Sequence, residues 1–197
     1  MKILVTAAAV CALVVLLAGC TSGTSSDIPH LGGGSAHAGS GQDQPAKLHA
    51  AADCIRSHGA PGYQDPVVDS TGHVYTDSRS LQNLSEAQGK AIEQACSSLI
   101  TAAGFSPTDE PPAPPALVAA GVKAAQCLRA HGLPDYRDPK GSTPFTPGHG
   151  FGLSADEIPN NGALGKQDPS LQAAFKACRK QLDAEVRASS LSALSHG

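Results

Sequence analysis

Two thirteen-residue segments of this chain, each beginning at a cysteine, match one another without a gap. The first is CIRSHGAPGYQDP from Cys54, the second is CLRAHGLPDYRDP from Cys127, and eight of the thirteen positions are identical. A shorter match, Ala-Cys at Cys96 and again at Cys178, follows within each copy. Similarity this dense indicates an internal duplication. It predicts two copies of one folded module, each with two cysteines.

Hydrophobic periodicity predicts that each copy is a helix, a loop and a returning helix. Apolar residues recur at helical spacing over 47–58 and 117–131, and glycine and proline follow both segments, as is common after a helix end. The returning helices are expected to begin near the capping residues Ser85 and Asp168. Turn-rich loops lie between the helices, and 73–75 favours a short strand. The fold class predicted is mainly α, with two tandem helical hairpins.

The same periodicity predicts which side chains face the core of each hairpin. On the first helices these are Leu48, Ala51, Ala52 and Ile55, and Val118, Val122, Ala125 and Leu128. On the returning helices they are Ala91, Ile92, Ala95 and Leu99, and Leu171, Ala174, Phe175, Cys178 and Leu182.

The N-terminus has the layout of a secretory signal. Lys2 precedes an unbroken apolar run that ends in Leu-Ala-Gly-Cys at Cys20, which resembles the lipobox cut by the lipoprotein signal peptidase. A plain membrane anchor is the alternative, but it usually needs about 20 apolar residues and this run is shorter. We therefore expect removal of residues 1–19, lipidation (a palmitate-type anchor) of Cys20, and attachment to the extracytoplasmic face of the cell membrane.

Six cysteines are present, and the expected processing leaves an even number for disulfides. Cys11 would leave with the signal peptide and Cys20 would be acylated, so four remain in an oxidising compartment. Four cysteines allow three pairings. Their matched positions favour one disulfide across each hairpin, joining Cys54 to Cys96 and Cys127 to Cys178. Each closure would contribute roughly 3–4 kcal/mol on the chain-entropy account.

Composition divides the rest of the chain. Residues 20–44 are rich in Ser, Gly, Thr and Gln, which predicts a flexible tether. The first module is assigned to 45–105, a Pro-rich linker to 106–115, the second module to 116–188, and a disordered tail to 189–197. Pro-rich runs form extended, semi-rigid spacers, so the linker is expected to separate the modules.

The repeated pattern, C-x-R-x-H-G-x-P-x-[FY]-x-D-P followed by an Ala-Cys helix, resembles a set of uncharacterised lipoproteins of high-GC Gram-positive bacteria. The resemblance covers about 45–100 and 116–183. Many of those proteins look like single copies that carry both cysteines, which implies pairing within each repeat. This chain departs from them in having two copies, and in Gln64 and Arg137 where a proline is common. The resemblance implies an address and a fold, but no activity.

Histidines recur in both copies and are the candidates for a metal site. His58 corresponds to His131, and His73 to His149, so each copy could offer a histidine pair to zinc or copper. Alternatively, His58 and His131 end their helices and donate to a terminal carbonyl. We prefer the helix-end interpretation, which assigns no metal and no cofactor. The Cys-x-x-x-His spacing also lacks the second cysteine of a haem site.

Other polar residues that recur in both copies have structural interpretations. Arg56 and Arg129 are expected to pair with Asp65 and Asp138 across the turn, although either could hold an anion. Tyr63 and its counterpart Tyr136 are expected to pack over the disulfides.

No enzymatic activity and no catalytic residue are predicted, because neither a Gly-x-Ser-x-Gly elbow nor carboxylates at fixed spacing stand out. The net charge of −3 disfavours nucleic acid. The predicted function is a non-enzymatic cell-envelope lipoprotein that binds or scaffolds an unknown protein or small molecule. An extracytoplasmic metal-binding lipoprotein using the paired histidines is the alternative.

Overall fold

The structure is a computed structural model that describes residues 43–109 and 111–197. The predicted signal peptide, Cys20 and the predicted tether up to residue 42 lie outside these residues. The described part is mainly helical, and each repeat forms a helical hairpin closed by a disulfide, as the sequence predicts. None of the helices described is both long and apolar enough to span a membrane.

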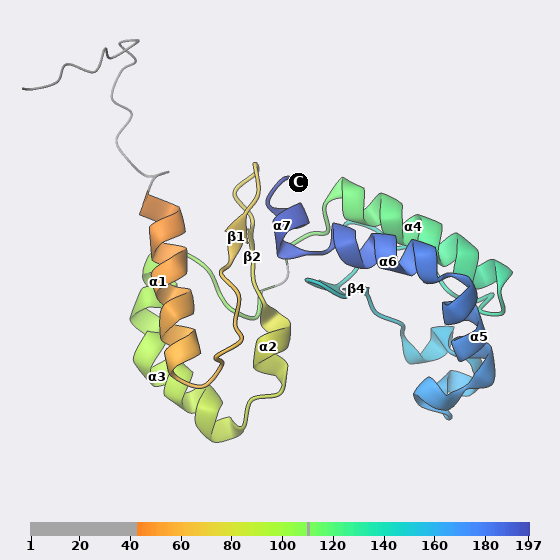
Figure 1. Cartoon of the computed structure of the whole chain (residues 1–197), viewed down its shortest axis with the longest axis horizontal. Coiled ribbons are helices and arrows are strands. Elements are labelled where there is room, and N and C mark those ends of the chain that lie inside the picture. The colour runs from red at the N-terminus through yellow and green to blue at the C-terminus, as the bar shows by residue number, and fades with distance from the viewer. Residues whose placement is uncertain (1–42, 110) are drawn as a thin grey trace, which may run out of the picture. The chain divides into compact units, whose positions relative to one another are not determined.

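The first repeat is built on two long helices that lie side by side (Figure 1). Helix α1 (Asp43–Ser57) and helix α3 (Glu86–Ala103) are joined by Cys54–Cys96. Strands β1 (Val67–Val68) and β2 (Val74–Tyr75) pair as an antiparallel hairpin between them, followed by the short helix α2 (Ser78–Gln82). The strand expected at 73–75 is therefore confirmed.

The second repeat has the same plan with a longer connection. Helix α4 (Pro115–Ala130) lies beside α6 (Arg179–Ala188), and strands β3 (Phe145–Thr146) and β4 (Gly150–Phe151) form its hairpin (Figure 1). The added length folds into three 3-10 turns, at Ala155–Glu157, Pro159–Gly162 and Gly165–Gln167. The returning helix is interrupted at Cys178, which separates α5 (Pro169–Ala177) from α6.

Local capping chemistry sets the ends of these helices. Ser85 and Gln88 form a reciprocal capping box at the start of α3, and Asp168 accepts two backbone N–H groups at the start of α5. Gly59 and Gly132 follow α1 and α4 with φ of 143° and 107°, a conformation that side-chain-bearing residues rarely adopt. The predicted helix starts and stops are therefore confirmed within a few residues.

The buried face of α3 differs from the prediction. Its buried residues are Ile92, Cys96 and Ala103, whereas Ala91 and Ala95 are exposed and Leu99 is 39% exposed. The disulfide to α1 turns the Cys96 side of the helix inward, and the alanines one position before Ile92 and Cys96 then face out.

The buried face of α4 is also shifted. Leu117, Gly121 and Ala124 are buried beside the predicted Ala125 and Leu128, while Val118 and Val122 are only half-buried. A Cβ at Gly121 would lie 2.6 Å from the ring of Phe151, so the missing side chain admits that ring. Helix α4 consequently presents its small residues to the hairpin.

The prediction of a disordered tail at 189–197 is wrong, because this segment contains the short helix α7 (Leu191–Leu194). Leu194 is fully buried in an apolar cluster with Tyr75 of the first repeat and Phe145 of the second. Just before it, the Oγ of the fully buried Ser189 accepts the N–H of Gly150 at 2.9 Å. Both repeats therefore contribute apolar surface that orders the C-terminus.

The Pro-rich segment between the repeats is held in place by contacts with both of them. Ala113 and Pro114 are buried, Pro115 is the first residue of α4, and the Ala113 N–H donates to the Gly141 carbonyl at 2.8 Å. The Tyr75 hydroxyl donates to the Pro112 carbonyl at 3.0 Å. The segment is held against both repeats because its free carbonyl and N–H groups find partners there.

Candidate functional site

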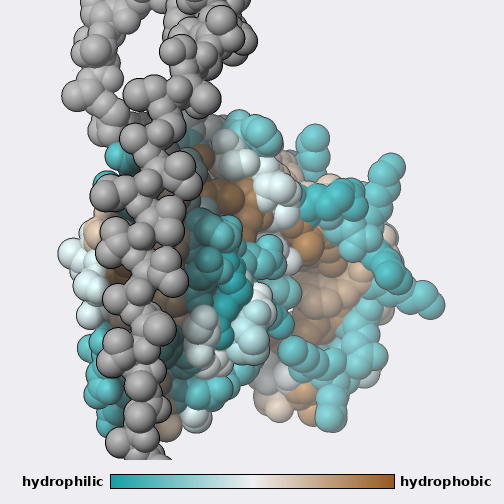
Figure 2. All heavy atoms as spheres, turned by 60° about the vertical axis from the view of Figure 1, so that its left-hand side comes forward, coloured by the Kyte–Doolittle hydropathy of each residue, from teal (hydrophilic) through white to brown (hydrophobic). Residues whose placement is uncertain are grey.

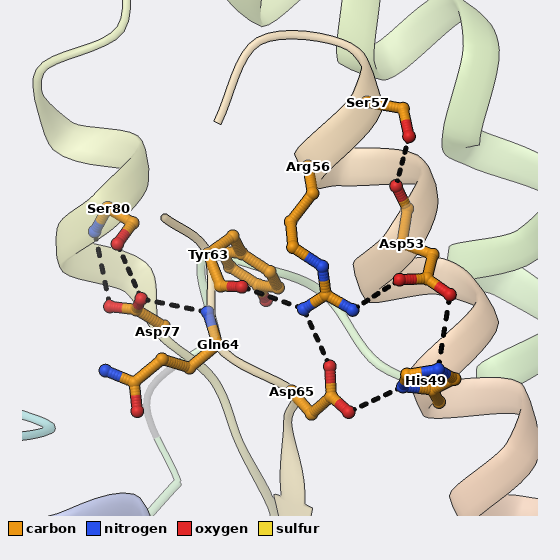
Figure 3. Close-up of polar contacts among 9 residues, drawn as sticks. All are labelled: His49, Asp53, Arg56, Ser57, Tyr63, Gln64, Asp65, Asp77 and Ser80. Carbon is orange, nitrogen blue, oxygen red and sulfur yellow. Dashed lines mark hydrogen bonds and ion pairs between the residues drawn. The ribbon is translucent and has the colours of Figure 1, made fainter. Parts of the chain in front are cut away.

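The repeated motif forms the same arginine-centred turn in both copies. Arg56 Nη1 donates to the Tyr63 carbonyl at 2.9 Å and to Asp65 Oδ1 at 2.8 Å. Figure 3 shows this guanidinium between α1 and the loop that follows it. In the second copy Arg129 makes the same two bonds, at 2.9 and 2.8 Å, to Tyr136 and Asp138. The predicted Arg–Asp pairing is confirmed, and these guanidinium groups hold the turn closed.

The two motif tyrosines lie under this turn. Tyr63 and Tyr136 are 2% and 5% exposed, and each packs in a cluster with the buried cysteine of its own repeat. Burial raises the pKa of both phenols above its usual range, because the charged form cannot be solvated there. Their position agrees with the predicted role as packing anchors beside the disulfides.

A buried acid next to each tyrosine was not foreseen. The N–H of Gln64, directly after Tyr63, donates to Asp77 Oδ2 at 3.2 Å (Figure 3). The N–H of Arg137, directly after Tyr136, donates to Glu157 Oε1 at 3.0 Å. The two acids differ in type and in distance along the chain, so the repeat alignment gives no signal for them.

One polar network occurs only in the first copy. His49 lies between two carboxylates, with Nδ1 at 2.7 Å from Asp65 and Nε2 at 3.2 Å from Asp53 (Figure 3). The hydrogen bond to Asp65, together with the charge of Asp53, raises the pKa of His49. Val122 and Gln126 stand at the matching positions of the second copy, so this network is not part of the duplicated framework.

The helix-end histidines lie against the disulfides. His58 Nδ1 is 2.9 Å from the Cys54 carbonyl oxygen, which makes the N–H a donor to the last turn of α1. The same nitrogen is 3.6 Å from the sulfur of Cys54 and 3.9 Å from that of Cys96. In the second repeat His131 directly follows α4 and lies beside Cys127 and Cys178. As in the first repeat, the histidine is exposed, one cysteine is half-buried and the other is buried. Because both sulfurs are bonded to each other, neither is the thiolate that a metal ion would require.

The two loop histidines, His73 and His149, lie in surroundings different from those of the helix-end histidines. His73 Nδ1 lies 2.7 Å from Thr71 Oγ1 and 3.3 Å from Asp69 Oδ2, within the β1–β2 turn. His149 follows β3, and burial together with the charge of Arg79 lowers its pKa. Within residues 43–109 and 111–197, the groups of three or more potential metal ligands contain His58 or His131 but neither loop histidine. The histidine pairs considered from the sequence are therefore not gathered into one ligand group.

An open groove runs along α3 of the first repeat. Its volume is about 770 Å³, and its walls come from α2, from α3 and from the loop after α3. The apolar lining residues are Leu81, Leu84, Ile92, Ile100 and Pro107. Charged and hydroxyl groups stand among them, including Glu86, Lys90, Glu93, Ser97, Thr101 and Thr108. The sequence pattern gives no signal for this groove, because the groove depends on which face of α3 the disulfide turns inward.

Comparisons with known proteins give no relative of this chain. No protein-family model matches the chain, and neither the curated proteins nor the solved structures yield a significant match.

Proposed function

We propose that the chain is a non-enzymatic lipoprotein of the cell envelope that binds an apolar ligand in the groove along α3. In this proposal Cys20 carries the lipid anchor and the two disulfide-closed repeats stand on the extracytoplasmic side. The signal-like N-terminus and the Leu-Ala-Gly-Cys sequence support the address, and the disulfides fit an oxidising compartment.

The groove itself is the observation that carries the binding role. Ligand sites are usually concave, largely apolar, and about 300–1,000 Å³ in volume, with a few polar groups that orient the ligand. The groove along α3 meets each of these conditions. A typical helix–helix hairpin has no need of such an opening, since filling it with side chains would add stability.

The second repeat supports this interpretation, because its equivalent surface is filled. Gly89 stands seven residues before Cys96, and Leu171 stands seven residues before Cys178. Leu171 is 5% exposed and packs with Tyr136 and Ala174. The open groove is therefore a property of the first copy and not of the shared framework.

The experiment compares residues 39–197, whose described part belongs to one compact unit, with two variants at Gly89. No heavy atom outside its own helix turn lies within 4 Å of a Cβ built there, so Gly89→Leu would project into the groove without a clash. Gly89→Ala is the matched control, because it makes the same helix-favouring change without filling the groove. An uncharged, polarity-sensitive dye should bind the wild type and the alanine variant and lose most of its binding to Gly89→Leu. Equal binding to all three proteins contradicts the proposed site.

A further inference from the structure

Resting on the proposed binding function, we infer that the groove along α3 holds one long hydrocarbon chain of a single-chain amphiphile whose polar end is uncharged or cationic.

The length of the groove suits a slender, extended ligand. Its lining residues on α3 run from Glu86 to Thr101, which is about 22 Å of helix at 1.5 Å per residue. The acyl chains of one membrane leaflet span about 15 Å, half of a hydrocarbon core of about 30 Å. A chain of that size can lie wholly along the apolar wall formed by Leu81, Leu84 and Ile100.

The cross-section of the groove disfavours a peptide helix as the occupant. A helix with side chains is about 10–12 Å across, so a helix of the same 22 Å length would fill more than twice the 770 Å³ available. Most of such a helix would remain outside, in contact with solvent. A single hydrocarbon chain is slender enough for this volume and can cover the apolar wall.

The charges along the groove indicate the polar end of the ligand. Lys90 Nζ is 2.7 Å from Glu86 Oε1, so these two charges oppose one another, and Glu93 remains as a further carboxylate in the lining. The net charge of the lining is therefore negative, which disfavours a fatty-acid carboxylate or a phosphate. The hydroxyls of Ser97, Thr101 and Thr108 can bond an uncharged polar group.

The differences between the copies fall on this surface. Glu93 lies three residues before Cys96, and the matching residue of the second repeat is Phe175, which packs on the cluster that contains Leu171. Ile158, from the longer loop of the second repeat, packs on that cluster too. In the second repeat the protein's own apolar side chains thus occupy the place that the first repeat leaves to a ligand. Figure 2 shows apolar areas open to solvent between hydrophilic side chains on one face of the molecule.

The test uses the full chain in the cell envelope and a photoreactive monoacylglycerol with a sixteen-carbon chain and an alkyne handle. After irradiation, labelled peptides should map to residues 81–108, and an excess of unlabelled monoacylglycerol should compete. Gly89→Leu should reduce this labelling roughly tenfold. The leucine side chain would occupy part of the groove, and overpacking of this kind costs on the order of a factor of ten or more in affinity. Gly89→Ala should label like the wild type, and the matching photoreactive fatty acid should label less than the monoacylglycerol.

Several outcomes overturn the inference. Labelling spread evenly over both repeats, or unchanged by Gly89→Leu, excludes the groove as the lipid site. Stronger labelling in Cys20→Ser shows that the chain's own acyl groups occupy it. A cross-link to a second protein that Gly89→Leu abolishes, with lipid labelling unaffected, shows a protein partner. If the uncharged dye binds in a Gly89-dependent way but the monoacylglycerol does not label, the binding function stands and the ligand class is wrong. If neither binds, both proposals fail.

Discussion

Replacing Asp69 should reveal how strongly one buried carboxylate fixes the β1–β2 turn. Its Oδ1 accepts the N–H and the hydroxyl of Thr71, at 2.8 and 2.7 Å, and the N–H of His73 at 2.9 Å. The Tyr75 hydroxyl, whose shorter contact is to the Pro112 carbonyl, lies 3.3 Å from Oδ2. Burial alone would raise the pKa of this carboxyl, but the hydrogen bonds outweigh it and lower the pKa from 3.8 to about 2.

The lowered pKa of Asp69 sets the size and the sign of the change in unfolding free energy with pH. The difference from the ordinary value corresponds to about 2 kcal/mol of stability that depends on the charged form. A carboxyl with a depressed folded-state pKa contributes fully above its unfolded-state pKa and loses that contribution as the pH falls through the folded-state value. We therefore expect the wild type to lose about 2 kcal/mol through Asp69 between about pH 5 and pH 2.

Urea unfolding of residues 39–197 across this pH range measures the effect. Asp69→Asn should be less stable than the wild type at pH 7, and its curve of unfolding free energy against pH should be flatter by about 2 kcal/mol. The control is Asp183→Asn, at a half-exposed carboxylate whose nearest cation, Arg179, is 3.9 Å away, and it should change stability by no more than about 0.5 kcal/mol. Parallel pH curves for the wild type and Asp69→Asn would refute the reasoning.

Four further predictions concern the anchor, the disulfides, the helix-end histidine and the C-terminus. Cys20→Ser should abolish metabolic labelling by an alkyne fatty acid, and retained labelling would contradict the anchor. Replacing Cys54 and Cys96 together by alanine should lower the unfolding free energy by roughly 3–4 kcal/mol, measured in urea without reductant. His58→Ala should cost roughly 0.5–1 kcal/mol and leave the metal content, measured by elemental analysis, unchanged. Leu194→Ala should cost about 2–5 kcal/mol, because a fully buried leucine is removed; a change within error would show that α7 does not pack.

The duplicated motif allowed the sequence to predict the hairpins, their caps and the cysteine pairing. These features depend on residues close together in the chain, or on one repeat compared with the other. Ser85 with Gln88 and the glycines after α1 and α4 act locally, so their effect is readable without a fold. The Arg56–Asp65 pair is predictable for the same reason, since only one turn separates the partners.

Contacts between residues far apart in the chain could not be predicted in this way. Glu185 reads as a surface residue of an amphipathic helix, yet it is 3% exposed and accepts the N–H of Phe151 at 2.6 Å. Burial raises its pKa, and only the bond from Phe151 opposes that effect. The tail failed as a prediction for a related reason. Its polar composition indicates disorder, but Tyr75 and Phe145 supply an apolar cluster that orders Leu194.

Under the proposed function, duplication separates structural residues from ligand-binding residues. Residues that hold the framework are the same in both copies, as with Arg56 and Arg129, because each hairpin needs its turn closed. Residues that line the groove differ, with Gly89 and Glu93 in one copy against Leu171 and Phe175 in the other. Filling the second site supplies buried apolar contacts to a small protein with few aromatic side chains, which strengthens the unit that carries the open one. The first copy leaves the corresponding surface open, as the groove along α3.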